Sequence, residues 1–163
     1  MRRFLPFIVV ALVFACNRGD FIKSQAKNYA VANYGKLGKS PQVTVTPVTI
    51  GDNLDYRIEQ GRSNQEFAAM LLRDFGHGEE DLARITARTA ALDSLKGALG
   101  DDVLSEITAY DCVVAYETGD TVWVQMTPTG ILLRITRDAK KRFVNPGEDA
   151  PGYAEINDRF KLK

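Results

Sequence analysis

Cys16 is the residue whose chemistry the sequence defines best, because of the residues that precede it. Arg2 and Arg3 are followed by an apolar run from Phe4 to Ala15, and Cys16 comes next. A basic segment, an apolar segment and a small residue before the cleavage point are the parts of an export signal. The run has twelve residues, fewer than the roughly 20 that a helix needs to cross a bilayer. The pattern therefore predicts export, with a thiol at the start of the mature chain.

The residues Val13, Phe14, Ala15 and Cys16 resemble the lipobox of bacterial lipoproteins, in which Leu, a small residue, and Gly or Ala precede the cysteine. Phe14 departs from this pattern, since a small residue is usual there. The resemblance covers only the first sixteen residues. It implies that the Cys16 thiol carries acyl chains that anchor the protein to a membrane of the bacterial envelope, where each buried CH₂ contributes about 0.8 kcal/mol. In the lipoproteins that this segment resembles, an aspartate directly after the cysteine retains the protein in the inner membrane. This chain has Asn17 at that position, which favours the outer membrane.

Two alternatives to lipidation remain open. An ordinary signal peptidase would leave Cys16 as a free N-terminal thiol, and a cytosolic protein with an apolar N-terminus is the other alternative. We expect a signal peptide at 1–15, a lipidated N-terminus and short tether at 16–19, and a single α+β domain at 20–163. Without residues 1–15 the chain has 148 residues, with 19 basic and 21 acidic side chains. This size suffices for one apolar core, and the charge balance gives no electrostatic footprint for nucleic acid.

Cys112 is the second of two cysteines and lacks a partner if Cys16 carries lipid. Strand alternation places it on one face with Tyr110, Val114 and Tyr116. A reactive thiol needs neighbouring basic groups, and the sequence places none close by. We therefore expect Cys112 to be a small buried apolar residue. A disulfide between the two cysteines is possible only without lipidation.

His77 is the only histidine, and three acidic residues follow at 79–81. A metal site is one interpretation of this cluster, but a single histidine without a second ligand cluster supplies too few ligands. Gly76 and Gly78 instead predict a turn between helices, with the acids favoured at the next helix N-terminus. We expect no metal and no cofactor.

Ser63 is better explained as a helix cap than as a nucleophile. Ser63 and Glu66 form a capping box pattern. No Gly-x-Ser-x-Gly motif surrounds the serine, and the carboxylate pairs near residues 52 and 101 lie in predicted turns. We therefore expect a protein that is not an enzyme, and an envelope hydrolase is the least supported alternative.

Hydrophobic spacing predicts an α+β fold with the element order α-β-β-α-α-β-β-β. The first helix covers 20–34 and ends at Gly35, and strands at 42–50 and 54–60 form a hairpin. A short helix at 63–76 buries Phe67, Met70, Leu71 and Phe75. A long central helix at 80–99 is expected to pack on a curved antiparallel sheet. Strands at 105–117, 121–127 and 131–137 complete the sheet as a three-stranded meander, and a last helical turn is expected at 152–160. This order is similar to that of cystatin-like and NTF2-like folds.

One face of the strand at 121–127 is a candidate interaction surface. Trp123 and Gln125 lie opposite the apolar residues at 122, 124 and 126. With Tyr110 and Tyr116, they would offer an aromatic, partly polar surface if nothing covers it. The alternative is that the C-terminal segment, with apolar residues at 153, 156 and 160, packs there.

These observations favour a membrane-anchored accessory or protein-interaction domain, with an envelope protein as its partner. Anchoring would act by raising the local concentration of the domain near that partner. The alternative function is a small-ligand-binding module with a pocket between the sheet and the long helix.

Overall fold

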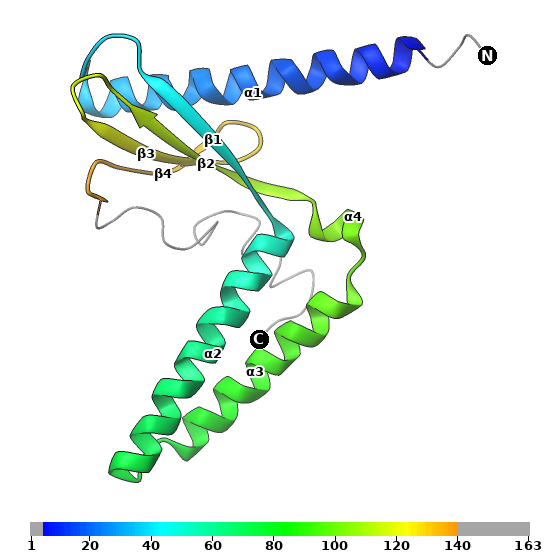
Figure 1. Ribbon diagram of the computed structural model, residues 1–163, viewed down its shortest axis with the longest axis vertical. Helices are drawn as coiled ribbons and strands as arrows, with labels where there is room; N and C mark the ends of the chain where they lie inside the picture. Colours follow the sequence, from blue (N-terminus) through cyan, green and yellow to red (C-terminus); the bar gives the residue numbers. More distant parts are fainter. Residues whose placement is uncertain (1–4, 140–163) are drawn as a thin grey trace. The chain divides into compact units, whose positions relative to one another are not determined.

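The computed structural model describes residues 5–139, with side chains from Arg18 onward. Contacts divide this part of the chain into two compact units, residues 5–47 with 109–139 and residues 48–108, each with its own apolar core. The elements in chain order are α1 (Leu5–Tyr34), β1 (Gln42–Thr49), α2 (Ile50–Phe75), α3 (Glu79–Ala98), α4 (Asp101–Leu104), β2 (Ile107–Ala115), β3 (Thr121–Met126) and β4 (Leu132–Thr136) (Figure 1).

The first unit is built on a four-stranded sheet with the strand order β1-β2-β3-β4. Cys112 of β2 pairs with Val124 of β3, which in turn pairs with Ile135 of β4, in antiparallel register. These three residues share one face, because paired residues in neighbouring strands point to the same side. The α+β class, the antiparallel sheet and the predicted meander of residues 105–137 are confirmed.

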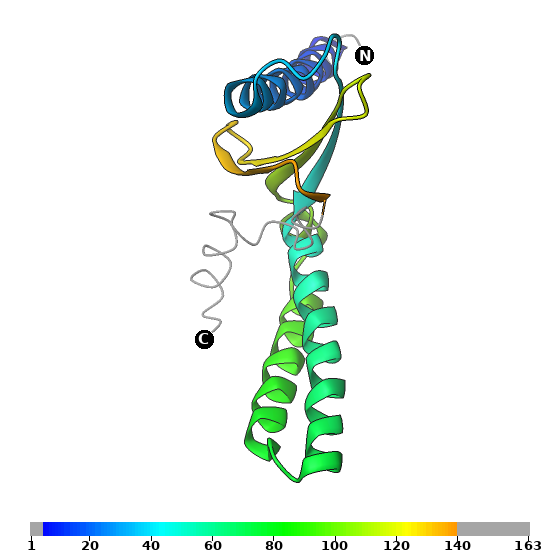
Figure 2. The same ribbon diagram turned by 90° about the vertical axis from the view of Figure 1, so that its left-hand side faces the viewer.

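The C-terminal half of α1 packs on this face of the sheet (Figure 2). Ile22, Ala26 and Ala30 have no exposed surface, and their spacing of four residues puts them on one stripe of the helix. The helix ends where the Gly35 amide donates to the Val31 carbonyl at 2.8 Å, with Gly35 at φ 73°. The predicted end of the first helix is confirmed. The sheet contributes the rest of this core, namely Cys112, Val114, Tyr116, Val122, Val124 and Met126.

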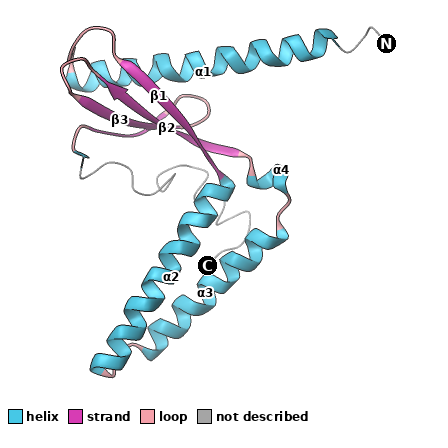
Figure 3. Cartoon of the chain, in the orientation of Figure 1, coloured by secondary structure: helices cyan, strands magenta, loops and turns pink. Residues whose placement is uncertain are grey.

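The predicted hairpin at 42–60 is wrong in its second half. Its first strand is β1, but the chain then enters α2 directly, as Figure 3 shows. A spacing of four residues puts Leu54 and Ile58 on the same face in a strand and also in a helix. Here both are buried on one side of a helix. The observed order is therefore α-β-α-α-α-β-β-β, with the short α4 before β2.

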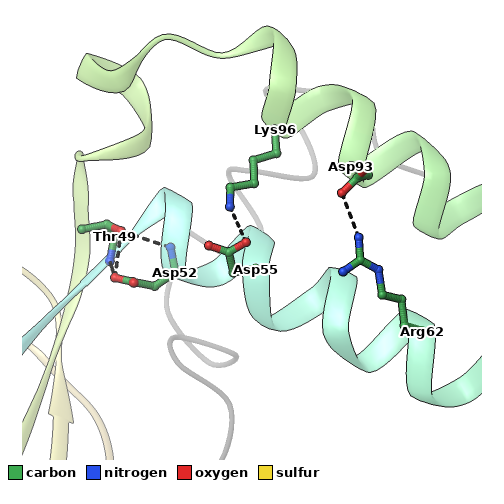
Figure 4. Close-up of polar contacts among 6 residues, drawn as sticks. All are labelled: Thr49, Asp52, Asp55, Arg62, Asp93 and Lys96. Atoms are coloured by element: carbon green, nitrogen blue, oxygen red, sulfur yellow. Dashed lines mark hydrogen bonds and ion pairs between the residues drawn. The ribbon is translucent and has the colours of Figure 1, made fainter.

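A capping box at the start of α2 explains why the chain turns helical there. The Thr49 hydroxyl accepts from the Asp52 amide at 3.1 Å, and the Asp52 carboxylate accepts from the Thr49 amide at 2.8 Å (Figure 4). Two donors at the helix start that lack intrahelical partners are thus satisfied. The capping box predicted at Ser63 is wrong, because Ser63 lies in the middle of α2.

The second unit is a hairpin of α2 and α3. Gly76 ends α2 in the left-handed conformation at φ 67°, and α3 confirms the helix predicted at 80–99. Leu54, Ile58 and Leu92 form its core, with leucines of α3 and α4 packed around them. Ion pairs of Arg62 with Asp93 at 3.3 Å and of Lys96 with Asp55 also join α2 and α3 (Figure 4).

Two packing predictions are wrong in consequence. The helix that packs on the sheet is α1, whereas α3 pairs with α2. The apolar stripe expected to be buried in the short helix is not, since Phe67 and Phe75 of α2 are exposed. The helical turn predicted at 152–160 lies outside the described residues.

Candidate functional site

Trp123 and Gln125 lie on the sheet face opposite the apolar residues 122, 124 and 126, as predicted, but they differ in exposure. Gln125 is only 1% exposed, and its Nε2 donates to Oδ1 of Asp111 at 2.8 Å across the β2–β3 pair. Trp123 is half-buried, between Val113 and Thr136 in the register. Gln125 therefore fastens two strands together rather than standing free at a surface.

Tyr110 and Tyr116 lie on the other face of the sheet, with Cys112. Tyr110 is half-buried and packs against the core under α1, and Tyr116 belongs to that core at 5% exposure. Burial raises the pKa of the Tyr116 hydroxyl above its ordinary value of 10. The four residues predicted as one interaction surface are thus divided between two faces.

A row of three polar side chains crosses the sheet on the Trp123 face. Gln125 pairs in register with Asp111 on one side and with Arg134 on the other. Burial raises the pKa of Asp111, and the hydrogen bond from Gln125 opposes that shift. The row combines a carboxylate, an amide and a guanidinium. The hydrogen bond from Gln125 to Asp111 joins β3 to β2 and helps to hold these strands in register.

The thiol of Cys112 is held in its neutral form. Cys112 is 1% exposed, and burial, followed by the charge of the adjacent Asp111, raises its pKa to about 12. Thiolates are the nucleophilic and metal-binding form of cysteine, and this environment suppresses them. The prediction of a small buried apolar residue is confirmed. Cys16 lies within α1, and its side chain is outside the described ones.

His77 lies exposed in the turn between α2 and α3. Gly76 and Gly78 flank it at φ 67° and 98°, values that suit glycine, so the predicted glycine turn is confirmed. The acids at 79–81 occupy the first turn of α3, where the helix dipole favours negative charge. Among the described side chains, which begin at Arg18, no three from His, Cys, Asp or Glu are grouped as a metal would require.

A groove of about 210 Å³ between α2 and α3 was not predicted from the sequence. The sequence predicts a strand and a turn at 54–63, which would separate Arg57, Gln60 and Gly61 from the helix at 80–99. Two guanidinium groups line it, from the buried Arg57 and the exposed Arg88. Gln60, Asn64 and Thr89 add polar side chains, and Gly61, Ile85 and Leu92 complete the lining.

The clearest exposed feature of the second unit is a set of apolar side chains on α2, here called the α2 apolar face: Phe67, Met70, Leu71 and Phe75. Phe67, Met70 and Phe75 are 59%, 39% and 67% exposed, and Leu71 is half-buried. The sequence identified these residues as one helical stripe but assigned it to the core. Large exposed apolar patches on soluble domains mark contact surfaces more often than isolated apolar residues do.

No family model, curated protein or solved structure matches the chain. No helix within the described residues is both long enough and apolar enough to span a membrane.

Proposed function

We propose that this protein is an envelope lipoprotein, anchored through acyl chains on Cys16, whose folded part is a non-enzymatic protein-interaction domain. The support for the anchor is the order of two arginines, an apolar run and Val13-Phe14-Ala15-Cys16. Asn17 favours the outer membrane as the location.

The position of the α1 core residues is compatible with cleavage before Cys16. Among the α1 side chains that the structure describes, which begin at Arg18, the first buried one is Ile22, and Ala26 and Ala30 follow it. All three come after Cys16, so the mature chain would keep these three side chains of the sheet core. With the core starting so soon after the anchor, the sheet unit would be held close to the membrane surface.

The single observation that carries the interaction role is the α2 apolar face. Fully burying a phenylalanine is worth about 1.5–3 kcal/mol, and both of its phenylalanines are more than half exposed. The Cys112 thiol is buried and protonated, and the polar row around Gln125 fastens the sheet. The exposed side chains of the α2 apolar face therefore favour contact with a partner as the role of this domain.

Expression of the full chain in a bacterial host, followed by intact-mass spectrometry of the membrane fraction, tests the anchor. We expect a chain that starts at Cys16 and carries the added mass of two or three acyl chains. Cys16→Ser should abolish this mass, whereas Cys112→Ala, the matched control at the other cysteine, should keep it. A mature chain beginning at Cys16 without acyl mass would contradict lipidation, and an unprocessed cytosolic chain would contradict export.

The groove between α2 and α3 favours a second candidate function, a small-ligand-binding module. Two arginines in one groove suit a small anion, because each guanidinium group presents several donors in a fixed plane. Titration calorimetry with inorganic phosphate tests it: binding that is lost in Arg88→Ala supports the module, and the absence of any heat contradicts it. The sequence predicts this pocket between the sheet and the helix at 80–99, whereas the helix that packs on the sheet is α1.

A further inference from the structure

The side chains of the α2 apolar face form a continuous ridge. Phe67, Leu71 and Phe75 are spaced four residues apart, and Met70 adjoins them one turn from Phe67. Rows at this spacing are the ridges that pack into the grooves of another helix. Phenylalanine and methionine are also enriched at interfaces, and the flexible thioether of methionine adapts to its partner.

The ridge runs obliquely around α2, with Phe67 beside the contact with α3 and Phe75, seven residues after Ala68, on the Ala68 side. Ala68 is buried, whereas Phe67, its neighbour in the chain, is 59% exposed. Gly61, two turns earlier and on the side of Ala68, lies directly against Thr89 of α3. Phe67, Met70 and Phe75 nevertheless remain 59%, 39% and 67% exposed, so within the described part of the chain the ridge is open to a further element.

Charge indicates what kind of element fits. Residues 63–84 carry five acidic side chains and two arginines. Both arginines are already paired, Arg73 with Asp74 at 2.8 Å and Arg84 with Asp81 at 2.6 Å. Within the described part of the chain, the remaining acids, Glu66, Glu79 and Glu80, have no ion-pair partner.

We infer that the α2 apolar face is the docking site for a basic amphipathic helix of another protein. The apolar stripe of that helix would cover Phe67, Leu71 and Phe75, and its lysines or arginines would face Glu66, Glu79 and Glu80. A second copy would bring the same acidic ends together, and an anionic lipid surface would repel them. This inference rests on the interaction role proposed above and specifies its surface and partner.

Fluorescence anisotropy with two labelled synthetic peptides tests the inference on the full chain. Both peptides are 18-residue amphipathic helices with the same leucine stripe, and they differ only in carrying lysine or glutamate on the flanks. We expect the lysine peptide to bind at least tenfold more tightly at low salt, with the difference shrinking at high salt. Equal affinity for the two peptides, or no binding of the lysine peptide, would overturn the inference.

Variants locate the binding surface. The double variant Phe67→Ser/Phe75→Ser should weaken lysine-peptide binding at least tenfold, and helicity and melting temperature should change little because both side chains are exposed. Ile131→Ser is the matched control, because Ile131 is 62% exposed on the sheet unit. Glu66→Lys/Glu80→Lys should reverse the peptide preference. Loss of binding in Ile131→Ser alone would place the site elsewhere and overturn the inference.

The other possible occupants give distinct results. If the chain binds phosphatidylglycerol vesicles and this binding depends on Phe67, the α2 apolar face contacts a membrane and not a helix. If the chain forms a concentration-dependent dimer that the double variant abolishes, the face contacts a second copy of the chain. Either result overturns the inference. If the double variant still captures an envelope protein, the α2 apolar face is not the docking site, and the inference is overturned. The proposed interaction role would remain. Acyl mass on Cys16 reports the anchor independently of all these measurements.

Discussion

Gly61 of α2 lies so close to Thr89 of α3 that no side chain fits between them. A Cβ at position 61 would come within 2.2 Å of the Thr89 Oγ1, 3.1 Å of its Cγ2 and 3.2 Å of its Cβ. Rotating the threonine does not relieve all three contacts. Oγ1 also donates to the Ile85 carbonyl at 2.8 Å, which further fixes the side chain.

Gly61→Ala should therefore destabilise the protein. Overpacking costs about 1–3 kcal/mol, and the better helix propensity of alanine returns at most about 1 kcal/mol. We expect a net loss of about 1–2 kcal/mol in the free energy of unfolding, measured by urea denaturation. Gly97→Ala in α3 is the control, because a Cβ there meets nothing within 4 Å, and it should stabilise by up to about 1 kcal/mol. Equal effects at the two glycines would contradict this close approach.

The capping box at Thr49 makes a second prediction about α2. Thr49→Ala removes the hydroxyl that accepts from the Asp52 amide, and we expect a loss of about 1 kcal/mol in unfolding free energy. Ser63→Ala is the matched variant at the position where the sequence alone suggested a cap. Ser63 is exposed in the middle of α2, so its replacement should be neutral or slightly stabilising. A larger loss at Ser63 than at Thr49 would show that α2 begins later in the chain.

The errors in predicting α2 have one physical origin. Leu54 and Ile58 fit both the period of a strand and the period of a helix, and Thr49 with Asp52 decides between them. Once the helix starts at Ile50, its buried side runs through Gly61 and Ala68. Glycine and alanine add little to a hydrophobic pattern. The sequence therefore predicts burial of the larger stripe at Phe67 instead. The strands from residue 105 onward were predictable, because glycine turns and clean alternation bound each of them.

The candidate sites were harder to predict than the fold. The burial of Cys112 followed from its apolar neighbours, but the burial of Gln125 depends on its hydrogen bond to Asp111, a pairing that only the strand register reveals. The groove at Arg57 and Arg88 forms because residues 54–60 belong to a helix, whereas the sequence predicts a strand there. Sequence spacing locates stripes within an element, whereas the choice of partner element depends on tertiary packing.

The raised pKa of Asp111 predicts a pH-dependent effect of Asp111→Asn. In the folded protein this carboxyl binds its proton more readily than its ordinary value of 3.8 allows, because burial disfavours the charged form. Stability from this group is therefore fully present below that value and falls as pH rises through the folded-state pKa. The amide of the substituted side chain would keep an oxygen acceptor for Gln125 without the charge.

We expect Asp111→Asn to be more stable than the wild-type protein at pH 7, with the difference shrinking as the pH is lowered toward 3.8. Urea denaturation of both proteins at several pH values measures this difference, and the comparison cancels the titration of the other carboxylates. A difference independent of pH would mean that the Asp111 pKa is not raised by folding.

Cys112 should be nearly inert toward alkylation in the folded protein. With a pKa of about 12, the thiolate fraction at pH 8 is about one in ten thousand, and the side chain is 1% exposed. Iodoacetamide labelling of the Cys16→Ser chain, in which Cys112 is the only thiol, should be slow in buffer and complete in urea. Asp111→Asn in the same background should raise the native rate modestly, because the neighbouring charge is the second cause of the raised pKa. Rapid native labelling would contradict the burial of Cys112 under α1, and with it the packing of Ile22, Ala26 and Ala30 on the sheet.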